Sequence, residues 1–411
     1  MVARPYRRLK NHLRSMWSSN RMSALRVSSA VDDALARLPT DGNIAVVRDG
    51  PDTVIGLQPV DAVRAMGANA FPAIDGLRDG WWAGYCSYDL GRAVERVPDS
   101  NAPIADLADL YFVRFDTRIR IDGAGNVVVE GSGALGAAQP PGEVRPIRDW
   151  QSSLDRASWE RAVGRVLRHL RDGDCYQVNL TRRLEAPERT DPVALFRRVV
   201  RDNPAPHAAL LRLGDVAVVS ASPECFLRID DRAVTTRPIK GTSTDAVQLA
   251  DSEKDRAENV MIVDLARNDL GRVCEYGSVH VPDLYAVEQH PGLYHLVSTV
   301  TGTLRADATL GDALRATFPP ASVTGCPKPR VLQIIELLEP VRRGVYCGAV
   351  GFIDAGARVV DLNVAIRTFT LTPSSTSFGV GGGIVADSDP EAEWEETELK
   401  ARRLLEIAGS V

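Results

Sequence analysis

The chain has 411 residues, of which 44% are hydrophobic and 25% charged, so it can bury a large core equivalent to two or three domains. Its formal net charge of −5 excludes a broad basic surface for nucleic acid, and no apolar run reaches the roughly 18 residues that a membrane-spanning helix needs, so we expect neither nucleic acid nor a membrane as a partner. The six cysteines are scattered and form no C-x-x-C pair, which indicates free thiols in a reducing cytoplasm.

The N-terminal part predicts a basic arm followed by antiparallel strands. Residues 1–30 contain six arginines, one lysine and no acidic residue, and they lack the apolar segment of a secretory signal, so we expect a disordered arm. An α+β part follows over 31–130, with hairpins at 43–57 and 111–131 that each turn at an Asp-Gly sequence. Residues 131–150 are rich in Gly, Ala and Pro and predict a linker or long loop.

The remaining part, residues 151–411, predicts helices interspersed with paired strands. Helical periodicity runs from Trp159 to Leu170, and further helices are predicted at 192–203, 252–271, 327–338 and 390–407. Strands are predicted at 175–186, as a hairpin at 216–239, and at 346–354, 358–371 and 377–386. Because the strands come in hairpins and do not alternate strictly with helices, we predict an α+β fold in which the N-terminal part packs on this core.

The last predicted helix carries charged residues along one face. Glu393, Glu396 and Lys400 follow at i, i+3 and i+7. Acidic residues near a helix N-terminus ordinarily serve the helix dipole, and a Glu–Lys pair four residues apart is ordinarily a solvated ion pair. Taken alone, this helix needs no functional explanation.

A second helix, at 252–271, repeats the spacing with Asp255 and Glu258. Ser252 and Asp255 form a capping box, which accounts for Asp255 but leaves Glu258 unexplained. Carboxylates that face one cleft from two helices repel each other unless a divalent cation lies between them. Oxygen ligands mixed with water suit Mg²⁺ better than a transition metal, so the two helices together predict a magnesium site.

Lysine is scarce in this chain, and one lysine stands in the segment TTRPIKGTST at 235–244. Of 49 basic residues, five are lysines and 44 are arginines. A guanidinium stays protonated, whereas a lysine amine that is neutralised by burial can attack carbon. Lys240 is therefore either an ordinary ion-paired residue or a nucleophile.

Glycines and a histidine add two weaker signals. In FGVGGGIVADS, successive glycines after a strand let backbone amides approach an anion, although such a turn often serves only close packing. The glycines do not follow the order G-x-G-x-x-G at the start of a helix, so we expect no dinucleotide. His295 lies in an apolar run, where a core histidine is usual, although its ring could donate to a ligand oxygen.

Several segments together resemble the chorismate-utilising enzymes, the family of anthranilate synthase component I, aminodeoxychorismate synthase component I, isochorismate synthase and salicylate synthase. The similarity covers about residues 150–406 and rests on GDCYQVNLTRR, SPECFLR, TRPIKGT, DRAENVMIVDLARNDLGRVC, LYHLVSTVTG, PPASVTGCPKPR, YCGAVGF, AIRTF and GGGIVADSDPEAEWEETELKA. It implies chorismate as substrate and a fold with large, mostly antiparallel sheets in the core and helices outside.

The resemblance also implies roles for particular residues. Glu258 and Glu396 match direct Mg²⁺ ligands, and Asp255 and Glu393 match ligands that act through water. Glu224 matches the general acid that protonates the departing ring hydroxyl. The residues at matching substrate-binding positions are Gln177, Thr242, His295, Tyr346, Arg367, Gly382, Gly383 and Lys400.

Within the family, P-I-K-G-T resembles the aminodeoxychorismate synthases, because anthranilate synthases carry a small residue in place of Lys240. The resemblance implies that Lys240 attacks the ring and that ammonia then displaces it to give 4-amino-4-deoxychorismate, on the path to p-aminobenzoate and folate. Gln177 stands where isochorismate and salicylate synthases carry a lysine base, and a glutamine cannot activate water. The chain has no glutaminase motif, so ammonia would come from a glutamine amidotransferase subunit or from solution. The alternatives are anthranilate synthase component I and a non-catalytic scaffold of the same fold.

Overall fold

The computed structural model describes residues 29–139, 142–290 and 293–410, so most of the predicted arm, residues 1–28, lies outside it. None of the described helices is long and apolar enough to cross a membrane. The helices are α2 (Ser29–Ala36), α3 (Ala70–Asp75), α4 (Arg156–Arg171), α5 (Pro192–Asp202), α6 (Ala246–Asp251), α7 (Glu253–Gly271), α8 (Leu310–Thr317), α9 (Lys328–Leu338) and α10 (Pro390–Ile407).

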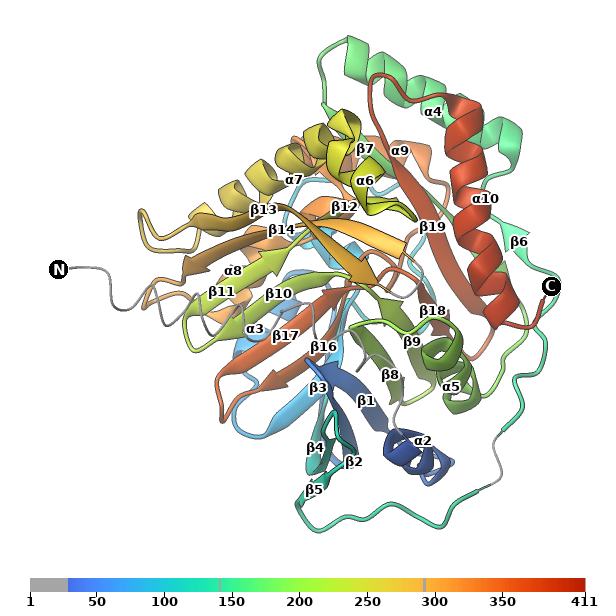
Figure 1. Ribbon diagram of the computed structural model, residues 1–411, viewed down its shortest axis with the longest axis vertical. Coiled ribbons are helices and arrows are strands. Elements are labelled where there is room, and N and C mark those ends of the chain that lie inside the picture. The colour runs from blue at the N-terminus through green and yellow to red at the C-terminus, as the bar shows by residue number, and fades with distance from the viewer. Residues whose placement is uncertain (1–28, 140–141, 291–292, 411) are drawn as a thin grey trace.

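The strands pair antiparallel in one large, twisted sheet with helices on its outside, which confirms the predicted α+β fold (Figure 1). They are β1 (Ile44–Asp49), β2 (Asp52–Ala65), β3 (Trp81–Cys86), β4 (Leu110–Ile121), β5 (Val127–Glu130), β6 (Gln151–Ser152), β7 (Gln177–Ala186), β8 (His207–Leu213), β9 (Val216–Ser222), β10 (Cys225–Asp230), β11 (Ala233–Arg237), β12 (Ile239–Ser243), β13 (His280–His290), β14 (Leu293–Thr303), β15 (Gly325–Cys326), β16 (Ala349–Asp354), β17 (Val359–Val364), β18 (Thr368–Leu371) and β19 (Thr376–Ile384).

The order of strands carries the sheet from one end of the molecule round to the other. From β13 and β14 it passes through β11, β10, β17, β16 and β3 to the N-terminal strands β4, β2 and β1. From β1 it continues through β8, β9, β18 and β19 to β7. The strands near both ends, β12 on one side and β7 and β19 on the other, come together in Figure 1.

Apolar side chains hold these layers together. The sheet has two arms, one from β13 to β16 and the other from β8 to β7, which the N-terminal strands connect. Between these arms, a cluster built on β1–β4, β8, β9 and β16 includes Trp81, which stacks on Phe352 at 5.8 Å between ring centroids. Helices α7 and α8 cover one arm, and α5 and α10 cover the other. Helix α4 begins after Asp155, whose carboxylate caps the amide of Ser158, and it buries Trp159 and Val163 against β7 and α9. These helices fix the ends of the strands on which the site is built.

The predicted helices at 252–271, 327–338 and 390–407 are confirmed to within one residue at each end, and so is the hairpin β4–β5. The hairpin β1–β2 is also confirmed, but β2 continues to Ala65, beyond the predicted end at residue 57. Residues 131–139 and 142–150 contain no helix or strand. The N-terminal strands join the sheet of the later part through the pairs β1–β8 and β3–β16.

Two strand predictions were wrong. The segment 216–239 is not one hairpin, because β9 pairs with β8 and β18, and only β10 and β11 form the hairpin. The segment 358–371 is two strands, β17 and β18, interrupted at Arg367, whose φ of 52° cannot continue a strand. Both errors fall where the chain leaves one arm of the sheet for the other.

Candidate active site

Strands from the two ends of the sheet bring Lys240 against Gln177 and Gly383. A Cβ atom added to Gly383 would lie 3.3 Å from the Lys240 Nζ and 3.0 Å from the Gln177 Nε2. Gln177 is fully buried, and neither polar atom of its amide has a hydrogen-bond partner in the described chain. A buried amide without partners is a strong candidate to bind a ligand.

Lys240 lies in surroundings that favour the neutral amine. Burial lowers the pKa of Lys240, and the nearby Lys400 adds to this effect, whereas the carboxylates of Glu258 and Glu224 oppose it. The net pKa lies below the usual lysine value. The side chain remains partly exposed, so a substrate can reach the amine, and a neutral amine is the form that attacks carbon.

Glu224 stands at the corner between β9 and β10 and is only 3% exposed. Burial raises the pKa of Glu224 to about 7, against the opposing effects of the Ser322 hydroxyl and Lys240. The Ser322 hydroxyl is close enough to act on Glu224 but forms no hydrogen bond as it stands. A carboxyl group with this pKa still holds its proton in part of the molecules at neutral pH, as a general acid must.

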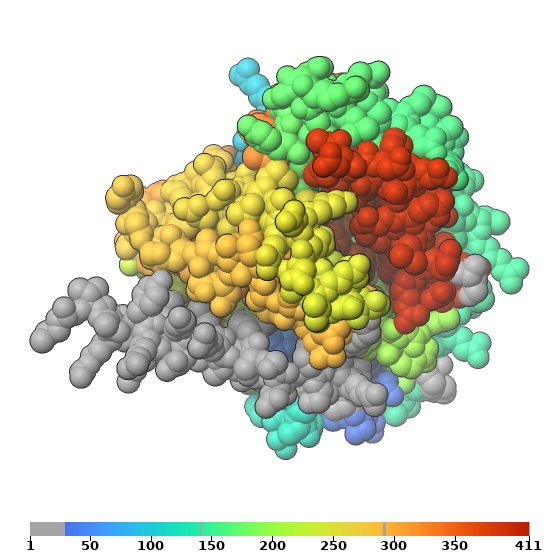
Figure 2. All heavy atoms as spheres, turned by 45° about the horizontal axis from the view of Figure 1, so that its top comes forward, coloured from blue at the N-terminus to red at the C-terminus, as the bar shows by residue number. Residues whose placement is uncertain are grey.

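The carboxylates on α10 converge on strand β19. Glu393 accepts a hydrogen bond from the Ser388 hydroxyl at 2.7 Å, and Glu396 forms an ion pair with Lys400 at 2.6 Å. A Cβ atom on Gly382 would lie 3.0 Å from Oε2 of Glu393 and 3.8 Å from Oε1 of Glu396. Glycine at this position therefore leaves room beside both carboxylates. Figure 2 shows the surface of α10, in red, meeting that of α6 and the following residues, in yellow.

The carboxylates on α7 face the same region. Asp255 packs against Gly241, where a Cβ atom would lie 2.8 Å from the carboxylate carbon, and Gly241 has a positive φ of 83°. Burial raises the pKa of Glu258; Lys240 lowers it, while Asp255 and Glu396 raise it further. The negative charges of α7 and α10 therefore act on each other, as expected for two helices that share a cleft.

The residues present fit a hydrated, oxygen-bound cation better than a closed metal centre. Among residues 29–139, 142–290 and 293–410, no three His, Cys, Asp or Glu side chains are close enough to hold a metal ion as they stand. Lys400 already contacts the Oε1 atom of Glu396. The donors offered by α7 and α10 are nevertheless all carboxylate oxygens, which a magnesium ion that keeps several of its waters accepts.

Thr242, His295 and Arg367 form a second group of predicted residues. The Thr242 hydroxyl and the Nδ1 atom of His295 are 2.9 Å apart, and the buried Nε2 atom of His295 has no partner in the described chain. Burial lowers the pKa of His295 to about 3, and the charge of Arg367 adds to this, so the ring is neutral. The half-buried guanidinium of Arg367 makes no hydrogen bond or ion pair with a described residue, so it is free to bind a carboxylate.

The other predicted positions are partly separate. Tyr346 is buried, and its ring lies against Gly379, four residues before Gly383 on the same strand, β19. Lys400 donates to the Gly381 carbonyl at 2.7 Å in addition to its ion pair. The structure thus brings Lys240, Gln177 and Gly383 together, and it places Tyr346 beside an earlier residue of the same strand.

Sequence reasoning missed the other lysines. The charge of Lys254 reaches Glu258, Glu393 and Glu396, and Lys328 is buried with its Nζ 2.7 Å from the Asp269 carboxylate, behind Glu224. With Lys240 and Lys400, every lysine in the described part of the chain lies in or beside the site. The scarcity of lysine was the signal that could have located them.

The chain is similar to a known protein family over most of its length. The family described as chorismate binding enzyme matches residues 36–406. The chain is 41% identical over 342 residues to aminodeoxychorismate synthase component 1 of Salmonella typhimurium, covering 78% of this chain and 75% of that one. It is 38% identical over 348 residues to anthranilate synthase component 1 of Saccharolobus solfataricus, covering 82% of each. The crystal structure of anthranilate synthase component I from Streptococcus pneumoniae superposes with a TM-score of 0.76 at 27% identity, over 86% of this chain and 92% of that one.

Proposed function

The chain belongs to the family of chorismate binding enzymes, and from this membership we propose that it converts chorismate and ammonia to 4-amino-4-deoxychorismate. Relatives named for this product and relatives named for anthranilate are similar to the chain at nearly equal identity, so identity alone does not separate the two activities. The observation that carries the proposal is the amine of Lys240, which is partly buried, has a lowered pKa, and lies beside Gln177 and Gly383.

The first half of the proposed reaction forms a covalent adduct. The neutral Lys240 amine bonds to a ring carbon at the far end of the two conjugated double bonds, both double bonds shift toward carbon 4, and the ring hydroxyl leaves from carbon 4. Glu224 gives its proton to that hydroxyl, which departs as water. The enzyme then holds a protonated secondary amine on Lys240 and an ionised Glu224.

The second half replaces the enzyme by ammonia. Ammonia bonds to carbon 4, the two ring double bonds shift back, and Lys240 leaves as a neutral amine. The ammonium group formed on the product gives one proton to Glu224, which restores both catalytic residues. The sum is chorismate plus ammonia giving 4-amino-4-deoxychorismate plus water.

Other residues of the site would hold the substrate. Within the described chain, the Arg367 guanidinium forms no ion pair and can bind a carboxylate, and the Gln177 amide and the neutral His295 ring have polar atoms without hydrogen-bond partners. Magnesium would be held by Glu258 and Glu396 directly and by Asp255 and Glu393 through water. When bound, it would neutralise a substrate carboxylate.

We also propose a partner and a location. The Salmonella typhimurium relative is named as component 1, which supports a second component for this chain as well. We propose that a glutamine amidotransferase subunit supplies ammonia. All six cysteines are free thiols, which is consistent with a cytoplasmic enzyme.

A product assay tests the proposal. The purified chain is incubated with chorismate, Mg²⁺ and an ammonium salt at pH 8, and the products are separated by chromatography. We expect 4-amino-4-deoxychorismate without release of pyruvate. Pyruvate together with the fluorescence of anthranilate would assign the chain to the anthranilate synthases. No turnover, together with no binding of chorismate by calorimetry, would favour a non-catalytic scaffold.

A further inference from the structure

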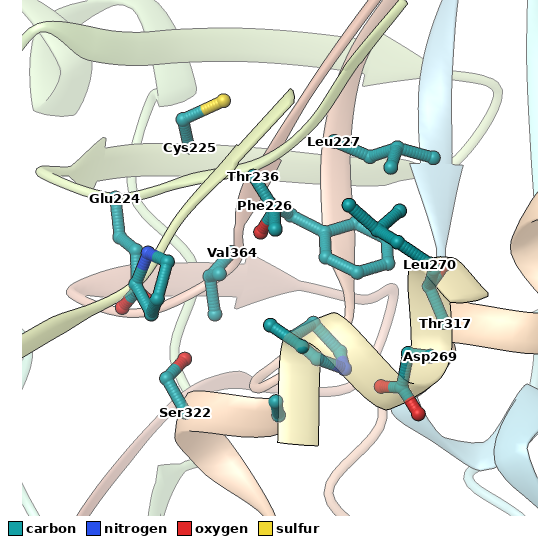
Figure 3. Close-up of a pocket in the computed structure, with 14 residues that line it drawn as sticks. Glu224, Cys225, Phe226, Leu227, Thr236, Asp269, Leu270, Thr317, Ser322 and Val364 are labelled. Atoms are coloured by element: carbon teal, nitrogen blue, oxygen red, sulfur yellow. The ribbon is translucent and has the colours of Figure 1, made fainter. Parts of the chain in front are cut away.

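A small cavity lies behind Glu224, on the side of β10 and α7. Its volume is about 20 Å³, which is room for a single molecule the size of water, and ammonia is of that size. Figure 3 shows Glu224 and Ser322 at one end, with the Ser322 hydroxyl directed toward Glu224, and Asp269 at the other end. Apolar side chains, among them Phe226 and Leu270, form the wall between the two ends.

The polar groups of this cavity are hydrogen-bond acceptors or hydroxyls. Glu224 and Asp269 both line the cavity, and no Lys, Arg or His is among the described residues that line it. The buried Ser322 hydroxyl, 6% exposed, makes no hydrogen bond in the described chain and is directed toward Glu224, so it can bind a small molecule that lies beside both groups. The Asp269 carboxylate at the far end is ion-paired with Lys328, whose Nζ also donates to the Thr317 carbonyl. Glu224 and Ser322, at the other end, are therefore the polar groups left to bind a small basic molecule in the cavity.

The position of the cavity matches the chemistry of the second half-reaction. The product carries nitrogen on the carbon that the hydroxyl has left, and Glu224 is the residue that protonates this hydroxyl. Ammonia that takes the place of the hydroxyl on the same face of the ring reaches carbon 4 from the side where Glu224 stands. The apolar wall also favours neutral ammonia over the ammonium ion, because an ion in so small a space loses most of its hydration.

We propose that the cavity bordered by Glu224, Ser322 and Ala266 is a binding site for ammonia, from which the second substrate reaches the adduct on Lys240. This inference rests on the proposed function. Glu224, ionised after the first half-reaction, accepts a hydrogen bond from the waiting ammonia and then takes the proton released when the new carbon–nitrogen bond is complete. Ser322 binds the same molecule and takes no proton.

The test fills the cavity and measures the two half-reactions separately. In the variant Ala266→Leu, a larger side chain on α7 enters the cavity. We expect the KM for ammonia to rise about tenfold or more, the scale on which a filled or emptied pocket discriminates small ligands. The adduct on Lys240, formed from chorismate without ammonia and detected by intact-protein mass spectrometry, should form as in the parent protein, with an unchanged KM for chorismate.

Two further variants keep the test decisive. Ala313→Leu adds the same volume to the same apolar cluster away from the cavity, so its KM for ammonia should stay at the parent value. Ser322→Ala removes a hydroxyl that makes no hydrogen bond in the described chain, so it should fold normally and raise the KM for ammonia about threefold. Because this hydroxyl lowers the pKa of Glu224, the variant should form the adduct at the parent rate when both are compared at a pH well below 7, where Glu224 is protonated. It decides the question if Ala266→Leu does not fold.

The outcomes separate the two proposals. If the adduct forms normally and neither Ala266→Leu nor Ser322→Ala changes the KM for ammonia, the cavity is a passive void and the inference is overturned while the proposed function stands. If both half-reactions slow equally, the variants act only on the fold, and the inference is again overturned. If the parent protein forms no adduct on Lys240 at all, the proposed function itself fails.

Discussion

Two acidic regions of the site differ in how their charges are compensated. On α10, Glu396 contacts Lys400 at 2.6 Å. Burial alone would raise the pKa of Glu396, but the charge of Lys400 and its hydrogen bond bring the pKa below its usual value. Glu224 is 3% exposed and forms no ion pair within the described chain, and its pKa is raised to about 7. A cation in direct contact keeps a carboxylate ionised, whereas burial without such a contact keeps its proton. One site thus contains both a cluster suited to a cation and an acid suited to proton transfer.

Lys240 lies close to both regions, so we expect its replacement to have the largest effect on activity. We expect Lys240→Ala to lower the rate of aminodeoxychorismate formation by at least about 10⁴-fold, because no other amine lies beside Gln177 and Gly383 in the described chain. Product chromatography measures the loss. The matched control is Lys10→Ala, outside the described residues, which should keep full activity. Turnover that persists in Lys240→Ala would remove the nucleophile from the mechanism.

Replacing the isolated acid should be the next largest effect. Glu224→Gln keeps the shape of the side chain but cannot donate an acidic proton, so we expect the rate of adduct formation to fall about 10³-fold. The wild-type rate should also decline as the pH rises through about 7, when Glu224 loses its proton, and the variant should lack this decline. Rapid mixing with chorismate followed by mass spectrometry gives both rates. An unchanged pH profile in the variant would assign the proton to another group.

The same variant should reveal the cost of ionising a buried acid. The pKa of Glu224 rises from 4.5 to about 7 on folding, so its contribution to stability is complete below pH 4.5 and is lost as the pH rises through 7. By pH 8 this loss reaches at most about 3 kcal/mol, and Glu224→Gln does not suffer it. Thermal unfolding at pH 5 and pH 8 should show the variant gaining stability relative to wild type at the higher pH. A constant difference between the two proteins would mean that Glu224 ionises freely.

Removing a carboxylate from the acidic cluster on α10 should weaken the binding of Mg²⁺. We expect Glu396→Gln to weaken Mg²⁺ binding at least about tenfold, measured by calorimetry without substrate. The matched control is Glu395→Gln on the same helix, where the carboxylate is exposed and lies 3.8 Å from Arg156. This control should bind Mg²⁺ as wild type does. Equal affinities in all three proteins would place the metal elsewhere.

Local sequence patterns predicted α7 and α10, the two helices that carry the acidic cluster. The spacing of Glu393 and Glu396 places both on one face of a helix whatever surrounds it, and Ser252 caps α7 as its sequence position indicates. The strands β13 and β14 were not predicted. Strand β13 contains two bulges and a positive φ at Tyr285, which break the alternation that marks a strand.

The surroundings of the isolated acid could not be predicted from local patterns. Glu224 is buried because β9 and β10 belong to different arms of the sheet, and Arg367 enters the site because its backbone interrupts a strand. The approach of Lys240 to Gln177 depends on how the two ends of the sheet meet. These are consequences of long-range register, and only the resemblance to a known family linked the residues beforehand.

Because most lysines of the chain lie at the site, digestion with a lysine-specific protease can report whether Lys240 is modified. A protease that cuts only after unmodified lysine has few places to act on this chain: positions 10, 240, 254 and 400, since Lys328 is followed by proline. Three of those four cuts fall at the site itself. A ring still attached to Lys240 would prevent one of them and leave residues 11–254 as a single fragment, so the occupied fraction of the enzyme could be counted from the sizes of its peptides.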